Sequence, residues 1–471
     1  MKVSVRMIDT QIEHLPHMTL EEITEAVNGT YYGEDKYRNS SVSAVVIDSR
    51  KVITDSLFVA IAGERVDGHN FITACMAQGA LCALSEQIVE GATKPYILVK
   101  DSVKALQELA RHYRACMDVK VVGITGSVGK TSTKEIIANV LSENFTVLKT
   151  EGNFNNEIGL PLTIFNLRPE HEVAVLEMGI SAFGEMEVLS RIGKPDICVF
   201  TNIGVAHIEF LLTRDGILKE KTDMLLHMPA DGSIVLNGDD ERLATVSPFN
   251  GVVPTVYGLK HESDFYATNI EELGLEGVRA TFHTPASSFD AFIPIPGLHM
   301  VYNSLAAIAV AYACGMKDAE IKRGLESAAT IKGRNNLIQT SSLSIIDDCY
   351  NANPASMLAS LRVLSQVKGR RVAILGDMAE LGEDWINMHK EVGAGASELD
   401  IDLLICVGDT ATYIQQGADK SAHTEALYFP NKENFLAEYH NLIKKGDTIL
   451  VKASNFMGFT EIVEVLAKFE A

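Results

Sequence analysis

The residues with the clearest chemical potential lie between Val121 and Ser132, in the stretch VVGITGSVGKTS. Gly126 and Gly129 are typical of a loop whose backbone N–H groups bind phosphate, Lys130 adds a positive charge, and the Thr131 hydroxyl suits Mg²⁺. The spacing departs from the usual Walker pattern, because Gly123 lies one residue too far upstream of Gly129. An ordinary glycine turn is the alternative. Gly-Lys-Thr between an apolar strand and a helix nevertheless favours an ATP site.

Other polar residues follow predicted buried strands. Glu177 follows the strand Val173–Leu176, and a carboxylate at the end of a parallel strand beside a phosphate loop is a good candidate Mg²⁺ ligand. His207 lies shortly after the strand Ile197–Phe200, although a lone histidine is more often structural. A loop further upstream contains three asparagines, which favour ligand binding over turn chemistry alone: Asn153, Asn155 and Asn156.

Two pairs of residues allow a functional and a structural interpretation. The helix predicted over Asp215–Leu226 carries Lys219 and Lys221, and its periodicity predicts that both lysines face solvent. Ser49 and Arg50 follow a predicted strand near the N-terminus. They suit a phosphate or a uracil edge, and a surface ion pair explains Arg50 equally well.

The elements that carry these residues alternate between strands and helices, which predicts an α/β fold with largely parallel sheets. After about residue 331, strands such as Val372–Leu375 and Leu403–Val407 alternate with helices and end in polar residues, as in a Rossmann-like sheet. We predict three domains: a small N-terminal α/β domain (1–103), a central P-loop-type mononucleotide-binding domain (104–330) and a C-terminal Rossmann-like domain (331–471).

Composition narrows the class of protein. The 471 residues are 46% hydrophobic and carry a formal net charge of −21, which argues against a nucleic-acid partner. Seven cysteines without a CxxC pair predict free thiols in a reducing cytoplasm. No apolar run reaches about 18 residues, so no transmembrane segment is expected. Charged and polar residues throughout the first 18 positions predict no signal peptide.

Taken together, the motifs resemble those of the Mur ligases in order and spacing, over nearly the whole chain. The segments that carry the resemblance are DSR (48–50), DGHNF (67–71), GITGSVGKTS (123–132), NFNNEIGLP (153–161), LEMG (176–179), TNIGVAHIE (201–209), EKTD (220–223), GLHMVYN (297–303), GR (333–334), DDCYNANPASM (347–357), LGDMAELG (375–382) and KASN (452–455). The central motifs are shared by all Mur ligases and by folylpolyglutamate synthase. YNANP and LGDMAELG resemble the members that join D-alanyl-D-alanine to UDP-N-acetylmuramoyl-tripeptide.

This resemblance implies an ATP-dependent ligase of peptidoglycan precursor synthesis that works through an acyl phosphate. In the catalytic set, Lys130 would hold the ATP phosphates, Thr131 and Glu177 one Mg²⁺, and His207 a second Mg²⁺, while Lys221 would be carbamylated by CO₂. Further ATP contacts would be Gly126, Ser127, Gly129, Thr131, Ser132, Asn303 (adenine), Arg334 (phosphates) and Asp348 (ribose). Substrate contacts would be Ser49 and Arg50 for uridine diphosphate, Asn153, Asn155 and Asn156 for the muramoyl peptide, and Tyr350, Asn351 and Asn353 near the nucleotide and dipeptide. We expect a monomer.

Two positions depart from the family pattern. Met300 stands where many relatives have Asn, which we interpret as a packing difference. Asn455 stands where Arg is common, and Asn cannot replace a bidentate, charged contact to a carboxylate.

Two other classes of function share part of this pattern. A different carboxylate–amine ligase, such as the diaminopimelate-adding enzyme or folylpolyglutamate synthase, would keep every central motif. A small-molecule kinase or a nucleotide-switched binding protein would need only the phosphate loop, and would leave Glu177, His207 and Lys221 unexplained.

Overall fold

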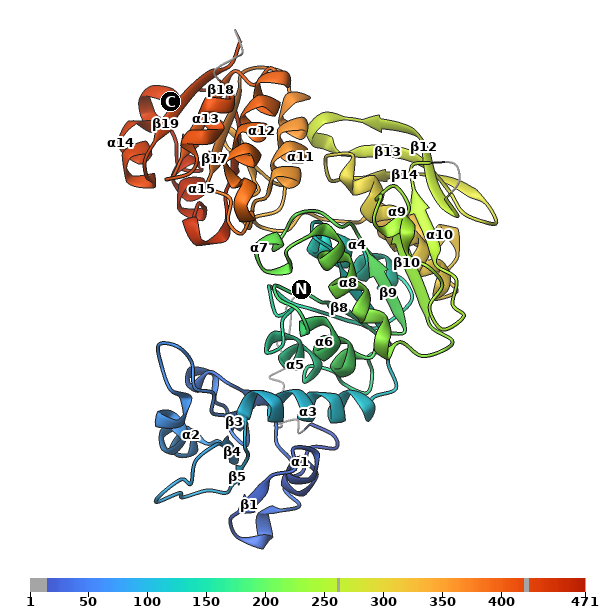
Figure 1. Cartoon of the computed structure of the whole chain (residues 1–471), viewed down its shortest axis with the longest axis vertical. Helices are drawn as coiled ribbons and strands as arrows, with labels where there is room; N and C mark the ends of the chain where they lie inside the picture. Colours follow the sequence, from blue (N-terminus) through green and yellow to red (C-terminus); the bar gives the residue numbers. More distant parts are fainter. Residues whose placement is uncertain (1–14, 261–262, 419–422, 471) are drawn as a thin grey trace, which may run out of the picture. The chain divides into compact units, whose positions relative to one another are not determined.

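The computed structural model describes residues 15–260, 263–418 and 423–470, and shows three α/β domains, each with its own sheet (Figure 1). Most of the residues used to predict that no signal peptide is present, 1–14, lie outside the described part. Contacts group the chain into two compact units: a first unit (1–121, 148–178 and 188–194) and a second unit (122–147, 179–187 and 195–471). Among the described helices, none is long and apolar enough to cross a membrane.

The first unit contains the N-terminal sheet. Its strand order is β1 (Thr30–Tyr32), β5 (Tyr96–Leu98), β4 (Cys82–Ser85), β3 (Leu57–Val59) and β2 (Val45–Val46), and only β1 is antiparallel to its neighbour. The Thr19 hydroxyl and the Glu22 carboxylate form a capping box at the start of α1 (Leu20–Ala26). The remaining elements of this unit are α2 (Ile72–Gln78), α3 (Ser102–Ala115), β7 (Val147–Lys149), α5 (Gly159–Ile164) and β8 (Val173–Glu177).

The second unit begins with the sheet that carries the phosphate loop. Seven of its nine strands follow the order β14 (Ser288–Ile293), β13 (Val278–His283), β12 (Phe265–Glu272), β11 (Thr255–Gly258), β10 (Ser233–Asn237), β9 (Ile197–Phe200) and β6 (Lys120–Thr125). Strands β6, β9, β10, β11 and β12 pair in parallel, and β12, β13 and β14 form an antiparallel extension. The helices are α4 (Lys130–Leu141), α6 (Glu185–Gly193, continuing into the first unit), α7 (Ile208–Leu211), α8 (Arg214–Thr222), α9 (His299–Ala313) and α10 (Asp318–Glu326).

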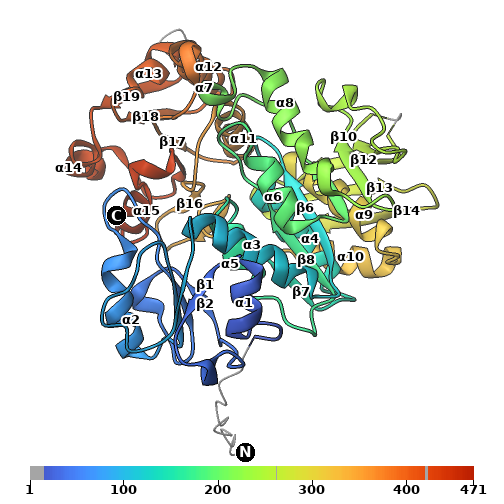
Figure 2. The same cartoon turned by 60° about the horizontal axis from the view of Figure 1, so that its bottom comes forward.

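The third domain is also part of the second unit, and its sheet is covered on both faces. The strand order is β15 (Asn336–Gln339), β16 (Ser344–Asp347), β20 (Thr448–Lys452), β17 (Arg371–Gly376), β18 (Leu403–Val407) and β19 (Glu425–Phe429), and all pairs except β15–β16 are parallel. Figure 2 shows α12 (Trp385–Glu398) and α13 (Thr412–Ala418) on one side of β17–β19, and α14 (Lys432–Leu442) and α15 (Thr460–Leu466) on the other.

Alternation along β17 explains this double cover. Val372 and Ile374 belong to the core that includes Phe435 of α14, whereas Ala373 and Leu375 belong to the core formed with α12, α13 and α11 (Pro354–Ser365). A strand buried on both faces reads as a continuous apolar run, which is the pattern of this segment. The α/β prediction and the parallel C-terminal sheet are therefore confirmed.

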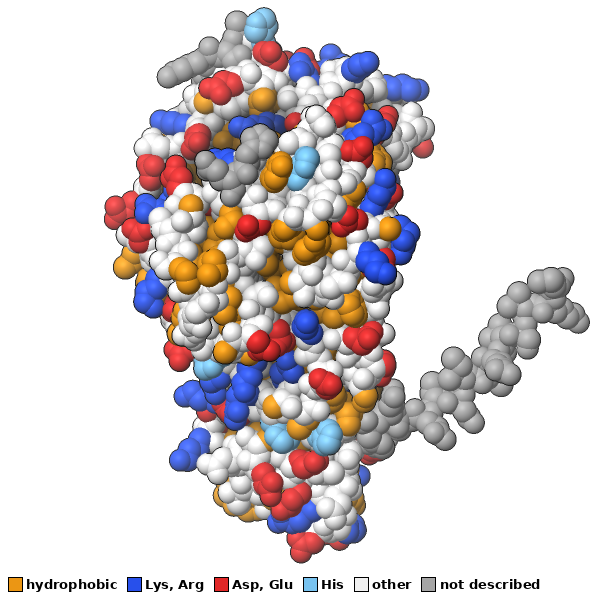
Figure 3. Space-filling model, turned by 90° about the vertical axis from the view of Figure 1, so that its right-hand side faces the viewer, with side chains coloured by type: hydrophobic (Ala, Val, Ile, Leu, Met, Phe, Trp, Pro, Cys, Tyr) orange, Lys and Arg blue, Asp and Glu red, His pale blue; other side chains and the backbone are white. Residues whose placement is uncertain are grey.

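Several local predictions need adjustment. The helix expected from Thr133 begins three residues earlier, at Lys130, directly after the left-handed Gly129. The helix expected over Asp215–Leu226 ends at Thr222 and continues as a 3₁₀ turn. All seven cysteines are free thiols, as predicted. On the face shown in Figure 3, acidic and basic side chains are interspersed.

Candidate active site

The phosphate loop (residues 126–132) follows β6 and includes the first residues of α4. Gly129 has a φ of +82°, in the left-handed region that favours glycine, and a Cβ at Gly126 would lie 1.9 Å from Oγ1 of Thr201. Asn202 supports the loop, because its Oδ1 accepts a 2.9 Å hydrogen bond from the Val128 N–H. The ammonium of Lys130 donates to the Gly126 carbonyl at 2.8 Å, so its charge lies over the loop.

The start of α4 is suited to an anion. Its N-cap residue, Gly129, provides no side-chain cap, and Thr131 in the first turn is only 6% exposed. A helix N-terminus carries partial positive charge and donates N–H groups to phosphate oxygens. The glycines, the helix start and Lys130 therefore fit a bound nucleotide phosphate.

Asn303 lies beneath this helix. It belongs to α9, is 7% exposed, and accepts a 3.0 Å hydrogen bond from the Thr133 hydroxyl. Its Nδ2 donates to Sδ of Met300 at 3.5 Å, and Met300 is itself buried. The Met300 departure is therefore a packing contact, as interpreted. Asn303 links α9 to α4, and its role toward adenine stays a prediction.

Lys221 corrects the prediction from helical periodicity. Lys219 is exposed and pairs with Asp223, but Lys221, two residues later on α8, is 1% exposed. Burial lowers the pKa of Lys221 well below its usual value, and the positive charge of Lys130 lowers it further, while Glu220 opposes the shift. The neutral amine is thus favoured more strongly at Lys221 than in a lysine exposed to water.

His207 follows β9, as expected, and serves as the N-cap of α7. Its φ of +61° is unusual for a residue other than glycine. Its Nδ1 lies 2.5 Å from Oε2 of Glu380 in the third domain. This contact with the His207 imidazole lowers the pKa of the Glu380 carboxyl.

Glu177 and the asparagine-rich loop lie in the first unit. Glu177 is 2% exposed, and its Oε1 accepts a 2.9 Å hydrogen bond from Nδ2 of Asn155. Asn156 accepts from the Gly159 N–H at 2.8 Å, so it helps to start α5, and Asn153 is exposed. At least one asparagine therefore orients the candidate metal ligand.

Ser49 and Arg50 lie on a short 3₁₀ turn of the first unit. Arg50 is 87% exposed and forms two hydrogen bonds with the Asp48 carboxylate, at 2.9 and 2.8 Å. These bonds lower the pKa of Asp48 to about 2. Arg50 is therefore held by an ion pair, with its guanidinium still open to solvent.

Among the predicted residues of the third domain, Arg334 and Tyr350 contact each other, whereas Asn351 and Asn353 bond to nearby backbone N–H groups. The guanidinium of Arg334 lies 4.0 Å from the ring centre of Tyr350, in a cation–π contact. Asn353 caps α11 by accepting from the Ser356 N–H at 2.9 Å, and Asn351 accepts from the next N–H along the chain. Capping accounts for Asn353, so a substrate contact of this residue stays a prediction.

Asp348, predicted to bind ribose, is buried and strongly held. Its Oδ2 accepts 2.6 Å hydrogen bonds from Nζ of Lys452 and from Oγ of Ser360, and its Oδ1 accepts from the Asn335 N–H at 3.2 Å. Asn455 donates to the Tyr350 carbonyl at 3.0 Å. The end of β20 therefore supports the segment 348–353.

The sequence alone did not single out Glu380 as a functional residue. It also did not reveal that Lys452 has a structural role. LGDMAELG carried the family resemblance, but no spacing rule singled out its glutamate, since its partner His207 is remote in the chain. Among the described residues, no group of three or more His, Cys, Asp or Glu side chains could hold a metal ion. This is compatible with Mg²⁺, which keeps waters and substrate phosphates as ligands.

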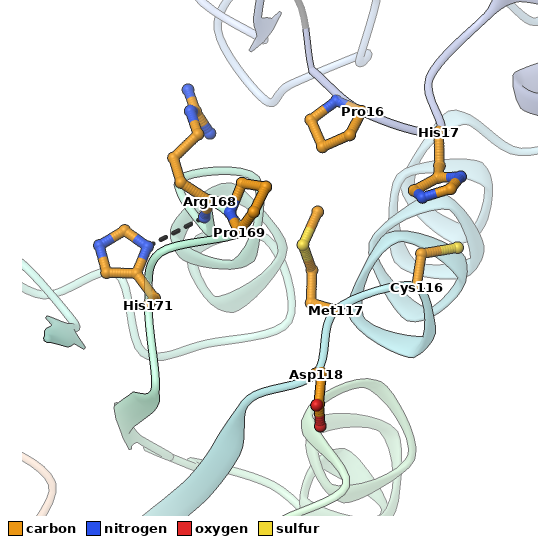
Figure 4. Close-up of a pocket in the computed structure, with 8 residues that line it drawn as sticks. All are labelled: Pro16, His17, Cys116, Met117, Asp118, Arg168, Pro169 and His171. Atoms are coloured by element: carbon orange, nitrogen blue, oxygen red, sulfur yellow. Dashed lines mark hydrogen bonds between the residues drawn. The ribbon is translucent and has the colours of Figure 1, made fainter. Parts of the chain in front are cut away.

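A separate cavity of about 250 Å³ lies in the first unit (Figure 4). His171 Nδ1 accepts a 2.9 Å hydrogen bond from the Arg168 N–H there, and the Arg168 guanidinium donates to the carbonyls of Phe165 and Leu167. None of the predicted site residues lines it; the lining residues are Pro16, His17, Cys116, Met117, Asp118, Arg168, Pro169 and His171.

Comparison with protein families identifies the chain. Three family models match: the Mur ligase family catalytic domain at residues 41–114, the Mur ligase middle domain at 124–311, and the Mur ligase glutamate ligase domain at 333–455. The chain belongs to the Mur ligase family. The resemblance seen in the motifs is thereby confirmed, and the chain is a ligase.

Relatives within the Mur ligase family match over almost the full length. The UDP-N-acetylmuramoyl-tripeptide–D-alanyl-D-alanine ligase of Bacillus subtilis is 37% identical, over 95% of this chain and 98% of its own length. The structure of MurF from Acinetobacter baumannii has a TM-score of 0.90 at 32% identity, covering 97% of this chain and 100% of the other. MurF ligase from Thermotoga maritima, in complex with ADP, has a TM-score of 0.81 at 31% identity, covering 90% and 97%.

Proposed function

We propose that this Mur ligase joins D-alanyl-D-alanine to UDP-N-acetylmuramoyl-tripeptide, with conversion of ATP to ADP and phosphate. The observation that carries the proposal is the match of 95% of the chain to a ligase of that name, together with a phosphate loop of the expected geometry. The product, UDP-N-acetylmuramoyl-pentapeptide, is a peptidoglycan precursor. The enzyme acts in the cytoplasm as a monomer.

The chemistry runs in two steps. A terminal carboxylate oxygen of the tripeptide attacks the γ-phosphorus of ATP, the bond to the bridging oxygen breaks, and ADP leaves. The amine of D-alanyl-D-alanine then attacks the acyl phosphate carbonyl, and the tetrahedral intermediate loses phosphate as the amine gives up a proton. Phosphoryl transfer depends mainly on positioning and charge neutralisation.

The phosphate loop supplies the positioning. Backbone groups around Gly126, Ser127, Gly129 and Ser132 bind the phosphates, and Lys130 moves from the Gly126 carbonyl to the anion when ATP enters. Thr131 and Glu177 would hold one Mg²⁺, and His207 would hold a second. These ions, when bound, neutralise charge on the phosphates. Asn155 holds the Glu177 carboxylate in a defined orientation.

Lys221 supports the metal site as a carbamate. Only a neutral amine adds CO₂, and burial together with the nearby Lys130 favours the neutral form of Lys221. Carbamylation replaces a cationic side chain with an anion whose oxygens resemble a carboxylate. Such an anion is a suitable partner for Mg²⁺ or for a water bound to it.

The other binding residues follow from the motifs. We assign the ATP contacts to Asn303, Arg334 and Asp348, the uridine diphosphate contact to Ser49 and Arg50, the muramoyl peptide contact to Asn153, Asn155 and Asn156, and the dipeptide side of the site to Tyr350, Asn351 and Asn353. The cation–π contact of Arg334 with Tyr350 and the exposed guanidinium of Arg50 support two of these assignments. We place the domain boundaries near residues 103 and 330.

The first experiment is phosphate release by the purified chain with ATP, Mg²⁺, UDP-N-acetylmuramoyl-tripeptide and D-alanyl-D-alanine, with each component omitted in turn. Release that requires all four, with the pentapeptide product detected by mass, is expected. Separate reactions with lysine- and diaminopimelate-containing tripeptides identify the third residue of the substrate. Turnover only with a different amine or carboxylate would retain ligase chemistry and reject these substrates.

Lys221 is tested separately. Lys221→Ala should reduce turnover by several orders of magnitude, and a short-chain carboxylate should restore part of it by standing in for the carbamate. Lys219→Ala is the matched control, since Lys219 is 73% exposed and on the same helix. Wild-type turnover by Lys221→Ala would reject the carbamate.

A further inference from the structure

The contact between His207 and Glu380 joins two parts of the second unit that are far apart in the sequence. His207 follows β9 beside the phosphate loop, and Glu380 lies in the loop after β17 of the third domain, residues 377–382, which we call the Glu380 loop. Their Nδ1 and Oε2 atoms are 2.5 Å apart. Both residues adopt left-handed backbone conformations, with φ values of +61° and +60°. Such conformations outside glycine persist only where the surroundings fix them, and they concentrate at functional sites.

The Glu380 loop is held firmly from within the third domain. The Met378 N–H donates to Nε2 of His389 at 3.2 Å, and the Ala379 N–H donates to Oγ of Ser454 at 3.1 Å. Met378 and Leu381, on either side, are buried in the core beneath α12. The backbone that carries Glu380 is thus held in place, and the Glu380 side chain is 44% exposed.

The His207 side of the contact is tied to the phosphate loop. The Gly204 N–H donates to Oγ of Ser127 at 2.9 Å, and the Ile203 carbonyl accepts two bonds from Arg214. A Cβ at Gly382 would lie 3.3 Å from Cγ2 of Ile208, so the two chains approach closely beside the contact. A carboxylate from a backbone segment held within one domain therefore meets the imidazole of a segment bonded to the phosphate loop of another.

We propose that Glu380 is the positioning residue of His207. A carboxylate 2.5 Å from Nδ1 favours the tautomer with its proton on Nδ1 and leaves the Nε2 lone pair for a divalent cation. Carboxylate–histidine–metal arrangements of this kind raise the affinity of the histidine for the metal. Because Glu380 comes from the third domain, docking of that domain and cation binding at His207 strengthen each other. The inference rests on the proposed function for the presence of a cation at His207.

The test measures cation binding in place of turnover. Mn²⁺ replaces Mg²⁺, and the electron paramagnetic resonance signal of free Mn²⁺ is followed while the full chain is added, with and without a non-hydrolysable ATP analogue. Glu380→Gln, which keeps the size of the side chain, should weaken one Mn²⁺ site by about tenfold. His207→Ala should remove the same site, and Glu380→Gln should have no further effect in that background. Glu383→Gln, an exposed carboxylate three residues away, is the control for loss of charge and should bind as wild type.

Two outcomes overturn the inference and are distinguishable. If His207→Ala loses a site while Glu380→Gln binds Mn²⁺ like wild type, Glu380 has no positioning role and the metal role of His207 stands. If His207→Ala binds the same number of ions with the same affinity, His207 holds no cation, and that part of the proposed function fails as well. Circular dichroism of each variant verifies that the fold is retained.

Discussion

Single buried ionisable side chains determine much of what this chain can do. Lys221 lies next to the positive charge of Lys130, yet it is almost fully removed from water. Lys452 is equally buried but has a carboxylate partner, Asp348, at 2.6 Å. The first lysine is held in a destabilised environment, which suits chemistry, and the second is held in a satisfied one, which suits structure.

A first prediction concerns the stability cost of Lys221. Lys221→Met replaces a buried amine with an apolar side chain of similar length, so the free energy of unfolding should rise by about 1–3 kcal/mol. The pKa of Lys221 is lower in the folded chain than in the unfolded chain. The free energy of unfolding of the wild type therefore rises as the pH increases between these two pKa values. The advantage of the variant should therefore be largest at the lowest pH and shrink as pH rises. Urea unfolding at several pH values in CO₂-free buffer measures this, and a less stable variant at every pH would contradict it.

A second prediction concerns the buried ion pair. Lys452→Met leaves the Asp348 carboxylate without its cation, so the third domain should lose about 3–5 kcal/mol of stability. Lys432→Met is the matched control, since its 2.6 Å ion pair with Glu461 is far more exposed, and it should cost at most about 1 kcal/mol. Trp385, the single tryptophan of the chain, reports unfolding of this domain by fluorescence. Equal losses in the two variants would show that burial of the pair is unimportant.

At the scale of elements, close packing of two helices supports the Glu380 loop. His389 of α12 accepts from the Met378 N–H and from the Thr410 hydroxyl, and its Nδ1 donates to the Trp385 carbonyl at 2.6 Å. Burial lowers the pKa of His389, which agrees with a neutral ring in this arrangement. The position of α12 against α13 therefore determines the position of the loop.

A third prediction tests that packing with two glycines of α12. A Cβ at Gly393 would lie 1.9 Å from the backbone carbonyl oxygen of Ile414, whereas one at Gly395 would meet only the flexible tip of Leu358, at 2.3 Å. Gly393→Ala should destabilise the third domain by about 1–3 kcal/mol through overpacking. Gly395→Ala should be neutral or gain up to about 1 kcal/mol, because alanine is the better helix former. Urea midpoints from Trp385 fluorescence compare the two, and equal midpoints would contradict the backbone clash.

At the scale of the whole molecule, the proposed binding residues come from all three domains. Ser49 and Arg50 lie in the N-terminal domain, the phosphate loop in the central domain, and Arg334 with Tyr350 in the third. Amide bond formation through an acyl phosphate requires that water be kept away from the intermediate. Movement of the three domains around the bound substrates would keep water away from the acyl phosphate.

A fourth prediction follows for the dimensions of the chain in solution. With an ATP analogue and UDP-N-acetylmuramoyl-tripeptide together, the radius of gyration from small-angle scattering should fall toward about 23 Å, the value for a compact chain of this length. Each ligand alone should produce a smaller change. Identical dimensions with and without both ligands would count against closure.

Local sequence determined the features that depend on neighbouring residues. The glycines and Lys130 of the phosphate loop and the apolar strands of the third domain were predictable, since turn conformation and strand burial are set within a few residues. Tertiary structure alone decided the burial of Lys221 and the contacts of Lys452 with Asp348 and of His207 with Glu380. Periodicity reports which residues share a helix face, whereas burial and pairing depend on what a distant part of the chain places against that face.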